Sequence, residues 1–167
     1  MLGVCPVPGG RQLQWGTHNV LLSLGPGTYL EIISRDPGLP VPAGGLLVDI
    51  PEDGDSRLLT WVWRVTDIYS AADAAREAGV AIGQVEQGSR TTPGGRELSW
   101  RLTDPYAMPM GGAIPFLIAW GDTPHPSTVV PAGGSIANFA IQHPEPDDVR
   151  GALSCLGAEV SVVAARE

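Results

Sequence analysis

The stretch Thr60-Trp61-Val62-Trp63-Arg64-Val65-Thr66-Asp67 decides the fold, because it joins a strand to the start of a helix. Its first six residues are mostly β-branched or aromatic, which predicts a strand over Thr60–Val65. Thr66 and Asp67 are capping residues, and they predict a helix over Ile68–Ala78 that ends at Gly79. Consecutive strands after a single helix exclude a simple doubly wound sheet and indicate an α+β fold. These strands are expected near Val80–Val85, Glu97–Thr103 and Ile114–Trp120.

The strand–helix–strand order returns toward the end of the chain. Ser135–Gln142 predicts a strand, and a helix follows from Pro144 through Leu156, with proline and acidic residues in its first turn. Gly157 ends this helix, and Ala158–Ala164 predicts another strand. The segment from Thr60 to Val85 and the segment from Ser135 to Ala164 are therefore an internal repeat of structure.

Toward the N-terminus the pattern predicts strands without a helix. Asn19–Leu24 and Thr28–Ser34 flank the turn signal Gly25-Pro26-Gly27, so they predict a hairpin. A further strand is expected near Val4, and Pro8-Gly9-Gly10 is typical of a turn.

Composition excludes several classes of protein. The length of 167 residues is typical of one domain. The net charge is −8, and the sequence contains no lysine. An acidic chain without a basic cluster argues against nucleic-acid binding and against anionic membranes. The longest apolar stretch, Ala113–Trp120, is too short to span a membrane, and no signal-peptide order is found, which favours a cytoplasmic protein. Cys5 and Cys155 have no metal-site or redox-motif spacing and are expected to be reduced, structural thiols.

Nine short motifs are spread along nearly the whole chain: Gly9-Gly10-Arg11, Trp15-Gly16-Thr17-His18-Asn19, Tyr29-Leu30-Glu31-Ile32-Ile33, Gly88-Ser89-Arg90, Leu98–Pro105, Pro115–Ile118, Trp120-Gly121-Asp122, Pro124-His125-Pro126 and His143-Pro144. Together they resemble the glyoxalase-like domain family, a group of mostly uncharacterised bacterial proteins in the vicinal oxygen chelate superfamily. The resemblance implies paired βαβββ modules, a small-molecule pocket on a concave sheet, and a divalent metal held by His and Glu side chains.

Two departures from the family pattern shape the expected organisation. The first module lacks its N-terminal βα unit, and Gln12 stands where members commonly have His after Gly-Gly-Arg. Three explanations remain open: the last strand–helix unit fills the gap by permutation, the start is misassigned, or a partner chain covers the exposed edge in a homodimer. The single domain divides into a partial first module (1–34), a loop (35–58), a second βαβββ module (59–121), a linker (122–134) and a third strand–helix–strand unit (135–167).

Three residues are candidate metal ligands, and two of them are candidate catalytic groups. Strand alternation places Glu31 on one face with Tyr29, and makes it the best ligand candidate. His18 is a candidate proton carrier or ligand, and His143 completes the conceivable set with Glu31. The alternatives are that Glu31 pairs with an arginine and that His18 bonds a loop carbonyl. The second module supplies no equivalent His, so the usual two-His, two-Glu set is incomplete.

Five further residues are candidates for substrate binding. The guanidinium of Arg101 suits a carboxylate or phosphate, although it could instead pair with Glu31 or a nearby aspartate. Asn19 could orient a substrate oxygen or cap a turn. The other three candidates lie in one rigid segment: Trp120, Asp122 and His125. The resemblance implies that this segment forms the rim of a pocket, and the alternative is that it is a linker.

Two classes of function follow from these residues. The first is a metal-dependent lyase, isomerase or dioxygenase relative in which Glu31, His18 and Arg101 work on a small molecule. The second is a non-catalytic module that binds or sequesters a small molecule, and the incomplete ligand set favours it. A third alternative is a truncated copy with a structural or dimer-forming role. Whether the protein is an enzyme is left open.

Overall fold

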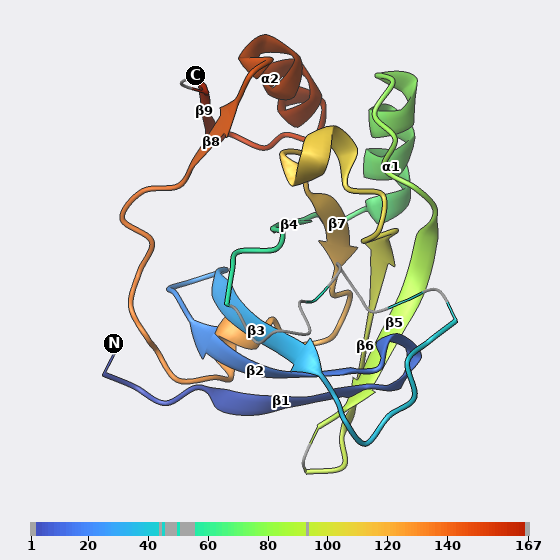
Figure 1. The fold of residues 1–167 in the computed structure, drawn as a ribbon, viewed down its shortest axis with the longest axis vertical. Helices are drawn as coiled ribbons and strands as arrows, with labels where there is room; N and C mark the ends of the chain where they lie inside the picture. The colour runs from blue at the N-terminus through green and yellow to red at the C-terminus, as the bar shows by residue number, and fades with distance from the viewer. Residues whose placement is uncertain (1–2, 44, 46–49, 51–55, 93, 166–167) are drawn as a thin grey trace. The chain divides into compact units, whose positions relative to one another are not determined.

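Two compact units make up the chain in a computed structural model that describes residues 3–43, 45, 50, 56–92 and 94–165 (Figure 1). Unit 1 contains Met1–Arg57, Gly88–Trp100 and Asp122–Ala137. Unit 2 contains Leu58–Gln87, Arg101–Gly121 and Asn138–Glu167. Part of the predicted loop 35–58, including residues 46–49 and 51–55, lies outside the described residues. None of the helices in the described ranges is long and apolar enough to cross a bilayer.

Unit 1 is built on an antiparallel meander. β2 pairs with β1 on one side and with β3 on the other, with Leu21 opposite both Val7 and Glu31. The predicted hairpin is confirmed, since the Leu24 and Thr28 amides donate to the Thr28 and Gly25 carbonyls around its turn. β1 also pairs with β5, through Arg11 and Thr91. The bounds are β1 Val7–Gln12, η1 Leu13–Trp15, β2 Thr17–Ser23, β3 Tyr29–Arg35, and η4 Pro126–Thr128.

The first strand corrects two expectations. It does not lie near Val4 but begins at Val7, and Pro8-Gly9-Gly10 lies inside it rather than in a turn. The register shifts between Pro8 and Gly10, where Gly10 has φ of 146°. Such a conformation suits glycine, so the Gly-Gly pair makes a β-bulge within the strand.

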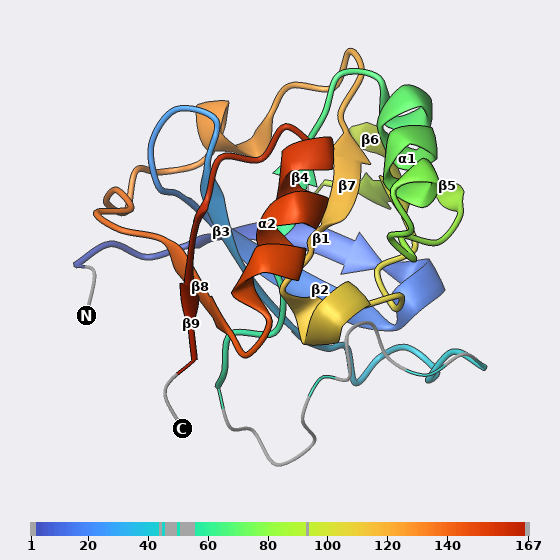
Figure 2. The same cartoon turned by 90° about the horizontal axis from the view of Figure 1, so that it is seen from above.

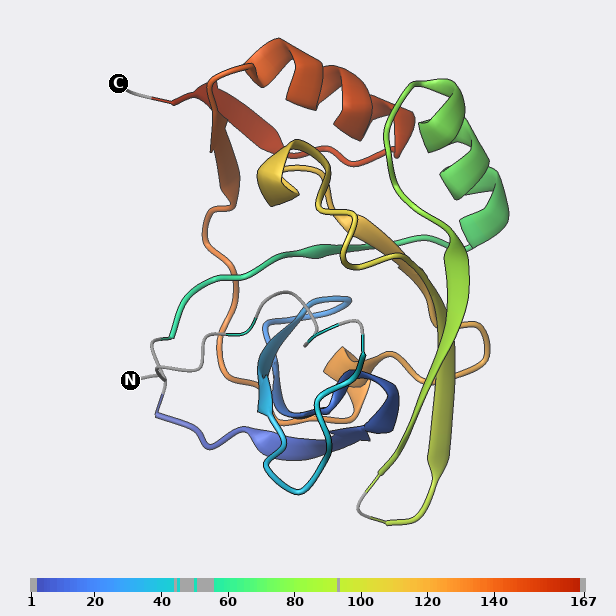
Figure 3. The same ribbon diagram turned by 45° about the vertical axis from the view of Figure 1, so that its right-hand side comes forward.

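Unit 2 contains the helix that the opening stretch predicts. Asp67 caps α1 (Ile68–Glu77), because its carboxylate accepts from the Tyr69 and Ser70 amides at 3.1 and 3.2 Å. β4 (Val62–Arg64) lies parallel to β7 (Phe116–Ala119), and β6 (Glu97–Thr103) is antiparallel to β7. Figure 3 shows β5 (Val85–Thr91) and β6 as a long hairpin. The elements β4, α1, β5, β6 and β7 therefore follow one another in βαβββ order, and the α+β class is confirmed.

Two sequence expectations for the later strands need correction. No strand covers Val80–Val85; β5 begins at Val85 instead. β8 (Ala140–His143) begins five residues after the predicted start at Ser135. It pairs in parallel with β9 (Ser161–Ala164), and α2 (Pro146–Cys155) packs on these strands (Figure 2). Hydrogen-bonded neighbours in the larger sheet follow the order β3-β2-β1-β5-β6-β7-β4.

The two units differ in what they bury. A hydrophobic core lies in unit 2, where the inner faces of α1 and α2 supply Ile68, Ala72 and Val149 to a cluster with Leu117. Leu117 of β7 is fully buried. Unit 1 buries Trp15 and Leu21, but alternate positions of its strands carry polar side chains. The buried polar residues of unit 1 are Gln12, Thr17, Asn19, Ser23, Asp36 and Arg90.

Candidate functional site

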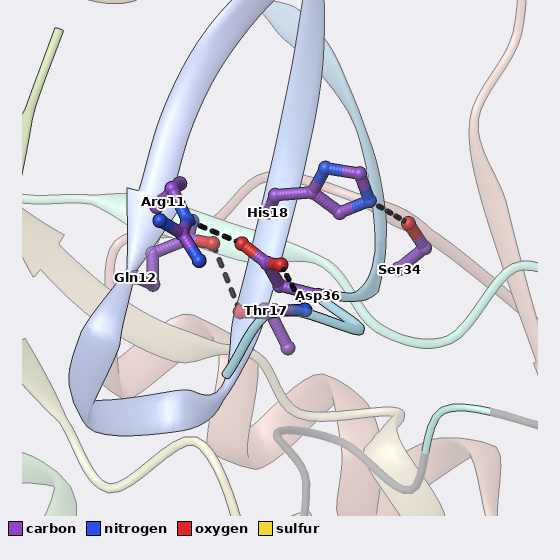
Figure 4. A network of polar contacts seen from close by, with 7 residues as sticks. Arg11, Gln12, Thr17, His18, Ser34 and Asp36 are labelled. Carbon is purple, nitrogen blue, oxygen red and sulfur yellow. Dashed lines mark hydrogen bonds and ion pairs between the residues drawn. The ribbon is translucent and has the colours of Figure 1, made fainter. Parts of the chain in front are cut away.

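Two side-chain amides of the unit 1 meander donate hydrogen bonds to the carboxylate of Glu31. Its Oε1 atom accepts from Asn19 Nδ2 at 2.5 Å and from Gln12 Nε2 at 3.2 Å. The register explains the meeting, because Glu31 lies opposite Leu21 and Asn19 is two residues away on the same face. Thr17 Oγ1 donates to Gln12 Oε1 at 2.9 Å (Figure 4). This bond holds the Gln12 amide with its nitrogen toward Glu31.

Arg90 of β5 brings a buried positive charge to the same place. Its side chain is largely enclosed, with the residue 7% exposed, and its NH1 group donates to Asn19 Oδ1 at 3.4 Å. Asn19 therefore bridges the two charges, because its oxygen accepts from Arg90 while its nitrogen donates to Glu31. Within the described part of the chain, the Arg90 side chain makes no other hydrogen bond and none reaches Glu31 Oε2. We call Gln12, Asn19, Tyr29, Glu31 and Arg90 the polar cluster.

The absence of a side chain at Gly9 makes room for this bridge. A Cβ atom at Gly9 would meet both Asn19 Oδ1 and Arg90 NH1 well inside normal contact distance. The bulge of β1 thus brings bare backbone against the polar atoms that join the two charges.

Tyr29 supplies a phenol beside both charges. Burial of its ring, together with the neighbouring Glu31 carboxylate, raises the pKa of Tyr29 far above its ordinary value, so the phenol stays protonated. Its ring meets the ring of His125 edge-on, with 5.4 Å between the centroids. His125 is fixed in turn by Ser127, whose Oγ lies 2.8 Å from His125 Nδ1. The predicted rim residue His125 therefore lies next to the polar cluster.

Burial also acts on the charge of Arg90. Loss of solvent lowers the pKa of its guanidinium, while the nearby Glu31 and Tyr29 oppose that shift. Arginine nonetheless keeps its proton in proteins, so Arg90 remains a cation within the polar cluster.

His18 lies on the opposite face of β2 from Asn19. It is exposed, and its Nε2 atom is 2.7 Å from Ser34 Oγ on β3 (Figure 4). The structure therefore does not bring His18 and Glu31 together, and their assignment as catalytic residues stays a prediction. The separation follows from the strand period of two, since consecutive residues point to opposite faces.

A second set of polar contacts in unit 1 fixes the chain directly after β3, at Asp36. Arg11 Nε donates to Asp36 Oδ2 at 2.5 Å, and the Gly38 amide donates to Asp36 Oδ1 at 2.8 Å. The hydrogen bond from Arg11 is the main cause that holds the pKa of Asp36 below its ordinary value. Figure 4 shows Asp36 between these partners.

The remaining predicted residues have other surroundings. Arg101 is exposed and lies over the Tyr69 ring, with 5.8 Å from its guanidinium carbon to the ring centroid. Asp122 is exposed in a turn of unit 1. His143 accepts from the Glu145 amide through Nδ1 at 3.0 Å. Arg101, His143 and the buried Trp120 all belong to unit 2, whereas Asn19, Glu31 and His125 are near Tyr29 in unit 1.

The side chains around Glu31 do not fit a divalent metal. Gln12 and Asn19 present hydrogen-bond donors to the carboxylate, and the cation Arg90 shares the cluster. In the ranges that the structure describes, no group of three or more His, Cys, Asp or Glu side chains could hold a metal ion. The expected ligand set of His18, Glu31 and His143 is thus not found as a group, and we assign no chemical step to a metal.

Three members of the polar cluster were not predicted as site residues: Gln12, Tyr29 and Arg90. Arg90 was missed because β5 was expected to end at Val85. The available signal was the family motif Gly88-Ser89-Arg90, which lies in β5, where Gly88 and Arg90 are the two buried residues.

Comparison with known proteins places the chain in a family. A model of the glyoxalase-like domain matches residues 1–157. The chain belongs to the glyoxalase-like domain family. No curated protein matches this glyoxalase-like chain. The crystal structure of a hypothetical protein from Staphylococcus aureus is similar to it, with a TM-score of 0.62 and 15% identity over 92% of this chain and 67% of the other. At this level of identity, the likeness supports the fold of the glyoxalase-like chain and not a function.

Proposed function

We propose that this glyoxalase-like protein binds a small polar molecule at the polar cluster of unit 1. The observation that carries the proposal is Arg90, a buried guanidinium with five N–H groups and one long hydrogen bond among the described residues. Buried charges in folded proteins are normally paired and fully hydrogen-bonded, because desolvation is costly. An oxygen-bearing ligand would complete the hydrogen bonds of this side chain.

The partial exposure of neighbouring residues supports access to the cluster. Glu31 and Tyr29 are half-buried, whereas Arg90 and Asn19 are buried. A ligand would thus approach along β3 and meet Glu31 before it reaches Arg90. Binding of this kind requires no metal, in keeping with the donors around Glu31. The lyase, isomerase or dioxygenase activity that the family resemblance implies stays a prediction.

Ligand-observed NMR with a library of small polar molecules tests this function. We expect hits for the native protein and at least about a tenfold loss of affinity in Arg90→Met, because a hydrogen bond to a charged group contributes about 1.5–3 kcal/mol. Arg35→Met is the matched control, since Arg35 lies exposed on β3 of the same unit. Equal binding by the native protein and folded Arg90→Met would overturn the proposal, as would an absence of hits for the native protein.

A further inference from the structure

Two groups of the polar cluster have unused hydrogen-bonding capacity among the described residues: the guanidinium of Arg90 and the Oε2 atom of Glu31. One is a donor and the other an acceptor. Arg90 offers N–H donors on a positive charge, and Glu31 Oε2 offers an acceptor on a negative charge. Neither group has a further partner within the described residues. The planar fork of a guanidinium matches the two oxygens of a carboxylate, with which it can form two parallel charge-assisted hydrogen bonds.

Asn19 shows what kind of group fits between the guanidinium and the carboxylate. Its amide places an acceptor oxygen toward Arg90 and a donor nitrogen toward Glu31, and both atoms are attached to one carbon. A ligand that lies alongside Asn19 needs the same order: an acceptor at Arg90 and a donor at Glu31, separated by few bonds. Asn19 can supply only a neutral oxygen to Arg90, whereas a ligand can supply a charged one.

Building on the proposed function, we infer that the ligand is a small carboxylate with a hydroxyl or ammonium group on the adjacent carbon. Its carboxylate accepts from Arg90, and its hydroxyl or ammonium group donates to Glu31 Oε2. The cluster itself is neutral, with one Arg and one Glu, so an α-amino acid keeps the neutral total and an α-hydroxy acid makes it negative. Because Gly9 has no side chain, the backbone of β1 can lie directly against the Asn19 and Arg90 atoms that form the bridge.

The proposal separates this class from simpler anions and from amides. Acetate has the carboxylate without the donor, and acetamide has the acceptor and donor of Asn19 without the charge. Glycolate carries the carboxylate with a hydroxyl, and glycine carries it with an ammonium group. A contact to Glu31 is worth about tenfold in affinity if it is a charge-assisted hydrogen bond.

Titration of these four probes at millimolar concentration, followed by the protein's amide signals in NMR, tests the inference. Glycolate or glycine should bind at least tenfold more tightly than acetate and acetamide, and which of the two binds better identifies the donor. Glu31→Gln should reduce that preference to less than threefold and leave the affinity for acetate nearly unchanged. Glu97→Gln, on an exposed residue of β6, is the control that should preserve the preference.

Two outcomes overturn the inference while the proposed function stands. One is equal binding of acetate, glycolate and glycine; the other is library hits that bind through Arg90 but lack the carboxylate with its neighbouring donor. If neither the probes nor the library bind to the folded native protein, both proposals fail. Arg90→Lys keeps the charge without the planar fork and should weaken the preferred probe, so it gives a second variant if Arg90→Met does not fold.

Discussion

Unit 1 and unit 2 differ in the polarity of the side chains that they bury. Among the described residues, seven polar or charged residues are buried; six lie in unit 1, and the seventh, Thr103, lies in unit 2. Unit 2 instead gathers aliphatic side chains from two helices and its strands. Apolar burial stabilises without directional demands, whereas each buried polar group needs a partner of the right geometry. The interior of unit 2 therefore depends on apolar packing, whereas that of unit 1 depends in part on hydrogen bonds between buried polar side chains.

The largest effect is expected in the apolar interior. Leu117→Ala removes a fully buried side chain from the core of unit 2 and should lower the free energy of unfolding by about 2–5 kcal/mol. Chemical denaturation followed by circular dichroism measures this change. Val163→Ala on β9, where the side chain is 42% exposed, should cost less than about 0.5 kcal/mol. A similar cost at both positions would contradict the assignment of the core.

A smaller effect, with opposite signs in the two units, is expected from one added methyl group. Gly9→Ala places a Cβ atom where it would clash with the side chains of Asn19 and Arg90. The substitution should lower the free energy of unfolding by about 1–3 kcal/mol, because these side chains must shift. Gly151→Ala in α2 meets nothing within 4 Å and should stabilise by about 0.5–1 kcal/mol. Thermal unfolding of both variants measures the contrast. Stabilisation by Gly9→Ala would show that the polar cluster is not closely packed on β1.

The smallest effect should depend on pH. The pKa of Asp36 is lowered by its contacts with Arg11 and Gly38, so these contacts stabilise the folded state above the ordinary carboxyl pKa. Their contribution is lost as the pH falls through the lowered value. Asp36→Asn should therefore lower the melting temperature at neutral pH, and its difference from the native protein should narrow in acid. A difference that is independent of pH would rule out this linkage.

Much of unit 2 could be predicted from local signals. The Asp67 cap and Gly79 bound α1 to within one residue of its predicted end, and β6 has its predicted bounds. These elements carry strong start and stop residues or a clear alternation with an apolar face. β5 lacks both, because its inward positions hold glycine and arginine rather than aliphatic residues, so its pattern did not indicate a strand.

The candidate site was predictable only in part, for a related reason. Alternation placed Glu31 and Tyr29 on one face of β3, and the structure agrees with that placement. The two hydrogen-bond partners of Glu31 come from β1 and β2, and Arg90 comes from β5. Pairing between strands is not encoded in any single stretch. Whether His18 or Asn19 would face Glu31 depended on the register, which the hairpin turn alone does not settle.

The orientation of the Asn19 amide has a consequence for stereochemistry. Its oxygen faces a cation and its nitrogen faces an anion, so rotating the amide by half a turn would set both ends against groups that repel them. A guest molecule fixed by the same two charges cannot bind end for end. Tyr29 lies near both charges and its ring meets that of His125, so these rings offer a third point of contact. Three unlike points distinguish mirror images, so a chiral guest should be accepted in one hand only.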